Sequence, residues 1–276
     1  MKKYRIIASD LDGTLLNSAS DISRENIDAI KRLNEEGVIF VTCTGRGYSE
    51  IPEKLLSLPF YRYSIYSNGA VVYDRESGRR ILKCISSDAV RKLLDILKPF
   101  DVHITFRHNG TSYVYSDVQG ESVFDYYHVI PAHEFVVRNF GVVLNDIEKV
   151  ICDMNDIEAF CVFFKNYDDK LLAKELIEKT ENLNAVEISK YSLEIMNVDA
   201  GKGNALLSLA EALEISRDQT IGVGDSDNDI SLVTSAGLGL AVSNAFESLK
   251  NVADEVICSN EEHIAEYILK NYILQK

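Results

Sequence analysis

The sequence predicts an α/β protein: a doubly wound, mostly parallel sheet with a separate α+β module inserted into it. Apolar runs at 4–9 and 38–43 flank an amphipathic stretch, which gives a strand, a helix and a strand at the start of the chain. The same rhythm of buried strands and helices returns after residue 198. Between these parts strands and helices do not alternate, which is typical of an α+β module. We therefore expect a core from residues 1–82 and 199–276 and an insertion from residues 83–198.

The first elements follow from local patterns. Tyr4–Ser9 is nearly all apolar, as expected for a strand that is buried on both faces. Ile22–Glu36 has a helical apolar stripe, with Ser23 as a plausible N-cap and Gly37 just after its end. Val38–Cys43 is the second buried strand, and because strand, helix and strand follow closely, a right-handed crossover is expected.

The remaining elements are predicted in chain order. A third strand ends near Tyr66, and one arm of a hairpin follows at 70–73. In the insertion we expect helices at 87–98 and 168–180, and strands at 103–107, 112–116, 157–164, 185–189 and 193–198. In the returning core we expect helices at 203–213, 228–234, 245–252 and 261–272, and strands at 220–223, 238–242 and 255–258.

Composition excludes several classes of protein. The 276 residues include 29 Lys+Arg against 43 Asp+Glu, a formal net charge of −14 that disfavours nucleic acid as a partner. No apolar stretch approaches the roughly 20 residues needed to span a bilayer, so no membrane association is expected. Five widely spaced cysteines, without a C-x-x-C pair, favour reduced thiols in a cytoplasmic protein.

Two aspartates, Asp10 and Asp12, directly follow the first predicted strand. In an extended chain, residues i and i+2 point to the same side, so both carboxylates can face one reacting centre. Ligand sites of open α/β sheets lie at the carboxyl ends of the strands, where this pair falls. Taken alone, the pair is equally typical of a solvated turn with capping aspartates.

Two further segments carry groups that bind phosphate. Thr44, Gly45 and Arg46 follow the second strand and offer a hydroxyl and a backbone N–H. Lys202 lies between two glycines at a predicted helix start, where a cation and the N–H groups of the helix coincide. Each segment, taken alone, is also typical of an ordinary exposed turn.

Three aspartates in five positions, Asp225, Asp227 and Asp229, follow another predicted core strand. Crowded carboxylates repel one another unless a cation is present, so the pattern indicates a hard divalent ion. An EF-hand loop starting at Asp225 is excluded, because its sixth and twelfth positions hold Ile230 and Ala236 instead of Gly and Glu.

A dinucleotide-binding site is also disfavoured. The first turn between a strand and a helix, where a Rossmann fingerprint belongs, carries Asp-Leu-Asp-Gly-Thr instead. The pair Gly201 and Gly203 lacks the third glycine or alanine and lies far down the chain. Nicotinamide cofactors are therefore not expected.

Together these motifs resemble those of one family. D-x-D-G-T-L-L after the first strand, T-G-R after the second, S-N-G-A after the third, K-G at a late helix and G-D-x-x-N-D near the end are similar to the haloacid dehalogenase-like superfamily. Their order, spacing and central insertion resemble its Cof-type (subclass IIB) phosphatases over essentially the whole chain. The resemblance implies a Rossmann-like core, an α+β cap and hydrolysis through an aspartyl-phosphate.

The resemblance also implies roles for individual residues. Asp10 would be the nucleophile and Asp12 the general acid and base. Mg²⁺ would be held by Asp10, the backbone carbonyl of Asp12 and Asp225, with Asp229 supporting the site from nearby. The groups implied to hold the phosphoryl oxygens are Thr44, the backbone of Leu11 and Gly45, Lys202 and Asn228, with Arg46 as a further candidate for substrate contact.

The expected function is that of a cytoplasmic Mg²⁺-dependent phosphatase acting on small phosphorylated metabolites such as sugar phosphates. A phosphotransferase such as a phosphohexomutase, built on the same core, is one alternative. A non-catalytic regulator that binds a phosphometabolite is another, although such a protein is expected to lack Asp10 or Asp12. No oligomeric state is predicted, and no motif in the insertion points to one substrate.

Overall fold

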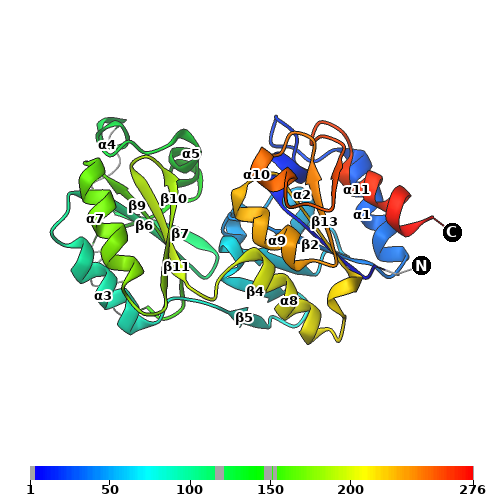
Figure 1. Ribbon diagram of the computed structural model, residues 1–276, viewed down its shortest axis with the longest axis horizontal. Helices are drawn as coiled ribbons and strands as arrows, with labels where there is room; N and C mark the ends of the chain where they lie inside the picture. The colour runs from blue at the N-terminus through cyan, green and yellow to red at the C-terminus, as the bar shows by residue number, and fades with distance from the viewer. Residues whose placement is uncertain (1–3, 116–120, 146–150, 152–153, 276) are drawn as a thin grey trace. The chain divides into compact units, whose positions relative to one another are not determined.

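The computed structural model describes residues 4–115, 121–145, 151 and 154–275. The chain forms two compact units (Figure 1). The first comprises residues 1–46, 51–81 and 201–276, and the second comprises residues 47–50 and 82–200. The predicted fold class, an α/β core with an inserted α+β module, is confirmed. Segment 47–50, which we expected in the core, groups with the insertion.

The first unit is built on a mostly parallel sheet. Among the described residues its strand order is β14-β13-β12-β1-β2-β3-β4-β5. The strands are β1 (Ile6–Ser9), β2 (Ile39–Cys43), β3 (Tyr63–Tyr66), β4 (Val71–Asp74), β5 (Arg80–Leu82), β12 (Thr220–Gly224), β13 (Leu238–Val242) and β14 (Glu255–Ile257). β1 pairs in parallel with both β2 and β12, whereas β3 and β4 form an antiparallel hairpin. The order reverses at β1, the point where ligands bind in sheets of this kind.

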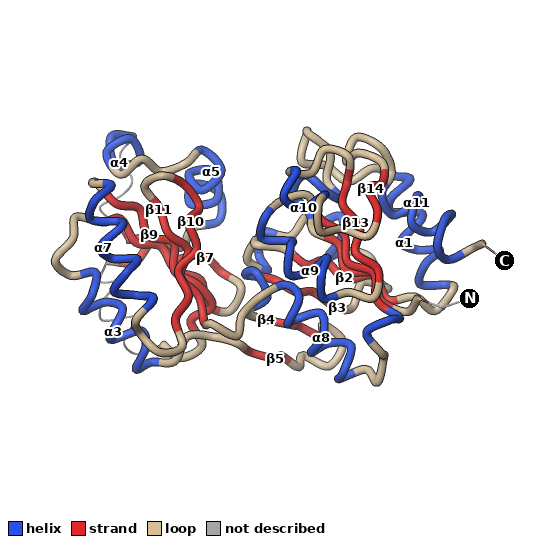
Figure 2. The backbone as a smooth tube through the Cα atoms, in the orientation of Figure 1, coloured by secondary structure: helices blue, strands red, loops and turns tan. Residues whose placement is uncertain are grey.

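Helices cover both faces of this sheet (Figure 2). They are α1 (Arg24–Glu35), α2 (Glu53–Leu56), α8 (Lys202–Ala212), α9 (Ile230–Ser235), α10 (Glu247–Lys250) and α11 (Ile264–Ile268). α8 and α9 pack on one face through Leu206, Leu209 and Leu232 against Ile6, Val41 and Ile65 of the sheet. On α1 the predicted cap is present, since Ser23 accepts a hydrogen bond from the backbone N–H of Asn26 at 3.1 Å. The buried strands are thereby held rigidly, which fixes where their carboxyl ends lie.

The second unit carries a sheet of order β10-β11-β9-β6-β7-β8 in the part of the chain that is described. Its strands are β6 (Val102–His108), β7 (Thr111–Tyr115), β8 (Val142–Leu144), β9 (Ile157–Phe164), β10 (Leu183–Ser189) and β11 (Ser192–Asn197). Its helices are α3 (Ser87–Leu97), α4 (Glu121–Tyr126), α5 (Pro131–Phe140) and α7 (Tyr167–Glu178). α3 and α7 bury Val90, Leu93 and Ile177 against Phe160 and Val162 of β9.

Some elements differ from the sequence-based expectation. Neither α4 nor α5 was predicted; no residue of α5 is fully buried, but Val137 packs against Val114 and Phe124, and the ring of His133 lies against Phe163. The helix expected at 261–272 begins three residues later than predicted: α11 (Ile264–Ile268) continues directly into a π-helical segment, Leu269–Ile273. The strand expected at 112–116 ends at Ser116, which lies outside the described residues. Among described helices, none combines the length and apolar character needed to cross a membrane.

Candidate active site

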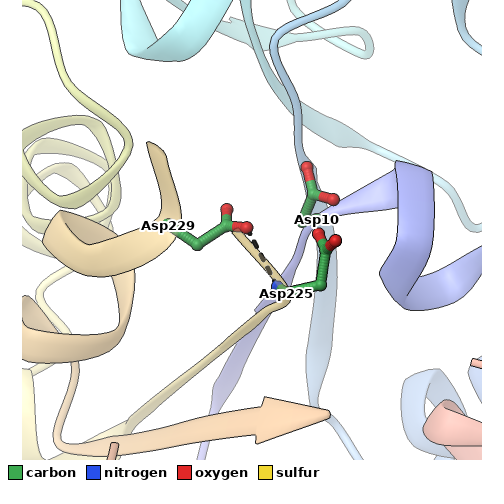
Figure 3. Close-up of side chains that lie close together, drawn as sticks. All are labelled: Asp10, Asp225 and Asp229. Carbon is green, nitrogen blue, oxygen red and sulfur yellow. Dashed lines mark hydrogen bonds between the residues drawn. The ribbon is translucent and has the colours of Figure 1, made fainter. Parts of the chain in front are cut away.

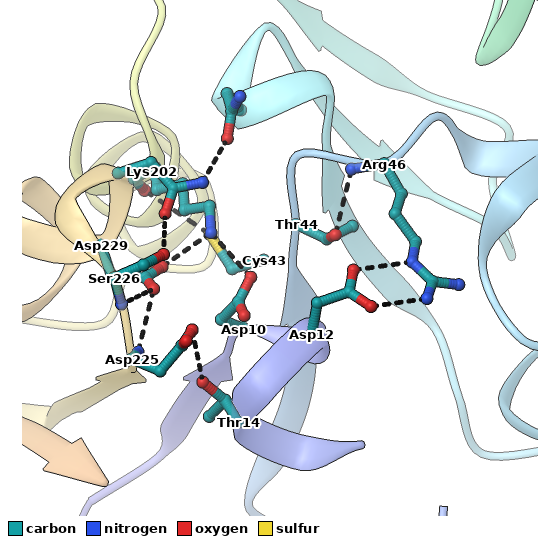
Figure 4. A network of polar contacts seen from close by, with 12 residues as sticks. Asp10, Asp12, Thr14, Cys43, Thr44, Arg46, Lys202, Asp225, Ser226 and Asp229 are labelled. Carbon is teal, nitrogen blue, oxygen red and sulfur yellow. Dashed lines mark hydrogen bonds and ion pairs between the residues drawn. The ribbon is translucent and has the colours of Figure 1, made fainter. Parts of the chain in front are cut away.

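Four polar segments meet at the carboxyl ends of the central strands (Figure 4). Asp10 directly follows β1, Thr44 directly follows β2, and Asp225 directly follows β12. Lys202 is the first residue of α8. The sequence predicted each of these residues at a strand end or helix start, and the fold brings them together because β2, β1 and β12 are neighbours.

Lys202 is the centre of the cluster and is almost fully buried, with 1% of its side chain exposed. Its ammonium donates to Asp10 Oδ1 at 2.7 Å and to Asp229 Oδ1 at 2.6 Å. Although burial opposes its charge, Asp10 and Asp229 raise the pKa of Lys202 above its usual value. Lys202 is therefore a fixed positive charge at every physiological pH.

The side chains of Asp10, Asp225 and Asp229 lie close to one another (Figure 3). One carboxylate oxygen from each lies within 4.8 Å of the others. Burial is the main reason why the pKa of Asp10 stands well above its usual value, with Asp229 and Asp225 adding to the shift and Lys202 opposing it. Burial, followed by Asp229, raises the pKa of Asp225 to about 6. Three carboxylates share one lysine, so the cluster favours an additional cation.

Two glycines leave the space that these carboxylates occupy. Gly13 has a φ of +74°, and a Cβ there would lie 2.4 Å from Asp225 Oδ2. At Gly224 a Cβ would lie 2.3 Å from the Cβ of Asp229. The glycines of the D-x-D-G and G-D motifs are thus required by the close approach of the aspartates, not by turn formation alone.

The donor set fits a hard divalent cation such as Mg²⁺. Hydrogen bonds engage both carboxylate oxygens of Asp229, since Oδ1 accepts from Lys202 and Oδ2 from the backbone N–H groups of Asp225 and Ser226. Among the described contacts, Asp10 and Asp225 each accept only through Oδ1, from Lys202 and from Thr14 Oγ1 respectively. A cation could be coordinated by the second oxygens, Oδ2, of Asp10 and Asp225, whereas both oxygens of Asp229 accept hydrogen bonds.

Asp12 is placed differently from Asp10. Its carboxylate is 56% exposed and accepts two hydrogen bonds from Arg46, from Nε at 2.8 Å and from Nη2 at 2.6 Å. Figure 4 shows this pair on the far side of Asp10 from Lys202. Arg46, which the sequence suggested as a substrate contact, donates to the predicted acid and base in this structure.

The predicted phosphate-binding residues lie on the same side of the sheet. Thr44 Oγ1 accepts from the backbone N–H of Arg46 at 3.1 Å, so its own hydrogen can point elsewhere. Asn228 Nδ2 donates to Asn68 Oδ1 at 3.1 Å. The backbone of Leu11 starts the short helical segment Leu11–Leu15 after β1, and that of Gly45 belongs to the loop after β2.

Sequence reasoning did not assign a site role to Asn68 or Thr14. Asn68 lies in the Ser67–Gly69 turn after β3 with a φ of +51°, and its amide is the partner of Asn228. Thr14 donates to Asp225 at 3.3 Å. The S-N-G and D-G-T motifs were visible in the sequence, but only the fold shows which side chain each one supports.

A mostly parallel sheet that presents a buried aspartate, a lysine and a second acidic loop at its switch point has the layout of a ligand-binding α/β enzyme site. The chain belongs to the haloacid dehalogenase-like hydrolases, because the model of that family matches residues 7–268. The resemblance to Cof-type members of this family, inferred from the motifs, is confirmed.

Similar proteins are named as phosphatases. Phosphatase YwpJ of Bacillus subtilis is 29% identical, with 98% of this chain and 100% of the relative covered. The 5-amino-6-(5-phospho-D-ribitylamino)uracil phosphatase YwtE of the same organism is also 29% identical, over 96% of each chain. A haloacid dehalogenase-like hydrolase structure from B. subtilis is 27% identical, with a TM-score of 0.80 over 99% of this chain and 100% of that one. The protein is accordingly a phosphoric monoester hydrolase.

Proposed function

We propose that this protein is a Mg²⁺-dependent phosphatase that hydrolyses small phosphorylated metabolites through an aspartyl-phosphate on Asp10. The observation that carries the proposal is the buried cluster in which Lys202 bridges Asp10 and Asp229, with Asp225 beside them. The bound ion would supply positive charge against the phosphate, with Asp10, Asp225 and the backbone carbonyl of Asp12 as its ligands.

The residues support a two-step displacement. A carboxylate oxygen of Asp10 attacks phosphorus, the bond to the leaving oxygen breaks, and Asp12 gives that oxygen a proton. Water then attacks the phosphoryl group on Asp10, Asp12 takes the proton from this water, and inorganic phosphate leaves. Lys202 fixes Asp10 in place and offsets the charge of the transferring group. Thr44 and Asn228, together with the backbone of Leu11 and Gly45, would hold the equatorial oxygens.

Two substrate classes stand out. Sugar phosphates are the class expected from the sequence. The named activity of YwtE adds a second class, a phosphate ester at the end of a ribityl chain. Both classes present a primary alkyl phosphate next to a row of hydroxyl groups, so we propose a phosphorylated polyol or sugar as the substrate.

The test is phosphate release from a panel that contains sugar phosphates, pentitol phosphates, a ribitylaminouracil phosphate and nucleotides. Asp10→Asn removes the nucleophile and is expected to lower turnover by at least about 10³-fold on every active substrate. A chelator is expected to abolish activity, and Mg²⁺ to restore it. Wild-type turnover in Asp10→Asn would contradict the proposal, whereas isomerised sugar phosphate without free phosphate would identify a mutase.

A further inference from the structure

The turn that carries Asp12 receives hydrogen bonds from three asparagine side chains. Leu11–Leu15 is a short helical segment, at the end of which the N–H of Leu16 donates to Leu11 O at 2.9 Å. The last carbonyl groups of such a segment lack partners within it. Here the carbonyls of Gly13, Leu15 and Leu16 accept from the Nδ2 groups of Asn244, Asn26 and Asn260 at 2.8, 3.4 and 3.0 Å respectively. The turn is therefore held from outside by side chains of other elements.

Asn244 lies in a loop that also contacts the loop of Asp225. This loop connects β13 to α10, and Asn244 Oδ1 accepts from the backbone N–H of Asn260 at 2.9 Å. Two residues further on, the backbone N–H of Phe246 donates to Asp225 O at 2.8 Å. Segment 244–246 thus bonds to Gly13 at one end and to Asp225 at the other. It connects the two loops that carry proposed ligands of the cation.

Gly13 is the point where these two loops touch. A Cβ on Gly13 would lie 2.4 Å from Asp225 Oδ2, so the Asp225 carboxylate packs directly against this glycine. The residue after Gly13, Thr14, donates to Asp225 Oδ1 at 3.3 Å (Figure 4). The residue before it, Asp12, has the backbone carbonyl that is the proposed third ligand. Because glycine has the widest range of φ and ψ, the peptide planes on its two sides turn independently unless one is held. The hydrogen bond from Asn244 holds the plane that follows Gly13.

We propose that Asn244 is a positioning residue that holds the Asp12–Thr14 turn against Asp225 and thereby raises the affinity of the site for a divalent cation. The ligand groups of the two loops are then ordered before an ion binds, so binding loses less free energy to ordering them. Residues that orient metal ligands typically change metal affinity or activity by about 10- to 100-fold. Asn244 is exposed, so we expect the lower end of this range. This inference rests on the proposed Mg²⁺-dependent phosphatase and adds a residue that sets how tightly the ion is held.

The direct test is the dissociation constant for Mg²⁺, measured by isothermal titration calorimetry with magnesium chloride alone. Asn244→Ala removes both side-chain hydrogen bonds and is expected to raise this constant about tenfold. Asn244→Leu keeps a similar side-chain volume without either hydrogen bond and is expected to give the same rise, which separates the loss of bonding from the loss of volume. If Asn244→Ala does not fold, Asn244→Leu takes its place.

Asn271→Ala is the matched control. Asn271 lies in the last helical segment of the first unit, where its Nδ2 donates to the backbone carbonyl of Tyr267 at 2.9 Å. The substitution removes an amide-to-carbonyl hydrogen bond of the same kind, but one that involves neither acidic loop. Its dissociation constant for Mg²⁺ is expected to stay within about twofold of the wild-type value.

Urea unfolding separates positioning from a merely structural role. In chelator, Asn244→Ala and Asn271→Ala are expected to lose similar, small amounts of stability, since each lacks only side-chain hydrogen bonds. Mg²⁺ at a fixed concentration should then stabilise Asn271→Ala as much as the wild type and Asn244→Ala less. In phosphate release, Asn244→Ala should need about ten times more Mg²⁺ for half-maximal activity, and added Mg²⁺ should restore most of the lost turnover.

The inference is overturned if Asn244→Ala binds Mg²⁺ as tightly as the wild type, or if Asn271→Ala loses affinity to the same degree. Either result leaves the phosphatase proposal intact, because the wild-type protein would still bind Mg²⁺ and release phosphate. Wild-type protein that binds Mg²⁺ but releases phosphate from no ester of the panel would remove the proposed function, while the comparison of dissociation constants would still decide the inference. Wild-type protein that binds no Mg²⁺ would remove both.

Discussion

Replacing Lys202 by methionine is expected to destabilise the first unit strongly in the absence of divalent ions. Its ammonium lies 2.7 Å from Asp10 and 2.6 Å from Asp229, and the exposed fractions of these two carboxylate side chains are only 7% and 0%. Removing one partner of a buried ion pair costs about 3–5 kcal/mol, because the remaining charge is left without compensation. Total stabilities are about 5–15 kcal/mol, so a loss of this size is readily measured.

Mg²⁺ is expected to reverse much of this loss. The wild-type cluster sets three carboxylates against one lysine, whereas Lys202→Met leaves the three carboxylates alone. A ligand that binds only the folded protein stabilises it by about 2.7 kcal/mol at one hundred times its dissociation constant. Because the variant has the greater excess of negative charge, Mg²⁺ should raise its free energy of unfolding more than that of the wild type.

Lys170→Met in the inserted unit is the matched control. Lys170 is also fully buried and donates to Glu187 Oε2 at 2.7 Å. However, Glu187 is 44% exposed and also receives Lys174, so it stays hydrated and paired when Lys170 is removed. We expect a smaller loss of stability and no response to Mg²⁺.

Urea unfolding followed by far-UV circular dichroism, with chelator and with Mg²⁺, measures all three proteins. Because the chain has two compact units, separate transitions are fitted where they occur. The reasoning is refuted if Lys202→Met unfolds at the wild-type urea concentration in chelator. It is also refuted if Mg²⁺ stabilises Lys202→Met and Lys170→Met equally.

Two further predictions concern the inserted unit and the Ser67–Gly69 turn. Burial, with Arg107 and His103 adding to it, lowers the pKa of His133 to about 3. Below about pH 6.5, the pKa expected in the unfolded chain, His133 is protonated in the unfolded protein but stays neutral in the folded one. The free energy of unfolding is therefore highest above about pH 6.5 and falls as the pH is lowered toward the folded pKa. At pH 5 the loss is about 2 kcal/mol, and urea unfolding at pH 5 and 7 should show it diminished in His133→Gln. Gly69→Ala would place a Cβ 2.3 Å from Gly201 O at a φ of +90°, so turnover should fall at least about tenfold. Gly78→Ala is the control: Gly78 has a φ of +71°, but no atom lies within 4 Å of the new Cβ. This variant bears only the backbone strain and should keep its activity.

Much of the core site was predictable because its residues are tied to local patterns. Asp10, Thr44 and Asp225 each follow a buried apolar strand, and parallel strands bring their carboxyl ends to one edge. Lys202 was predictable for a related reason, since it starts a helix that packs on the same sheet. Strand order then brings residues that are far apart in the sequence within hydrogen-bonding distance. Their proximity can therefore be predicted without knowing any side-chain geometry.

Other features depend on tertiary contacts that leave no local signal. The attachment of segment 47–50 depends on Gly110 and Ser112, about sixty residues further on, so composition alone placed it in the core. The contact between Arg46 and Asp12 joins two loops whose motifs suggest separate roles. Conversely, α5 was not predicted, and it packs on the inserted unit through side chains that are only partly buried, such as His133 and Val137.

The net charge of the whole chain and the local charge of the site affect the binding of anions in different ways. A formal net charge of −14 opposes binding of an extended polyanion, because repulsion acts along its whole length. A small phosphate meets only the local balance, in which Asp10, Asp225 and Asp229 oppose Lys202. In the proposed site one divalent cation would bring this balance to neutrality, while the charge of Arg46 is paired with that of Asp12. A site with no surplus of positive charge would then also favour departure of inorganic phosphate, because nothing would retain this small anion electrostatically.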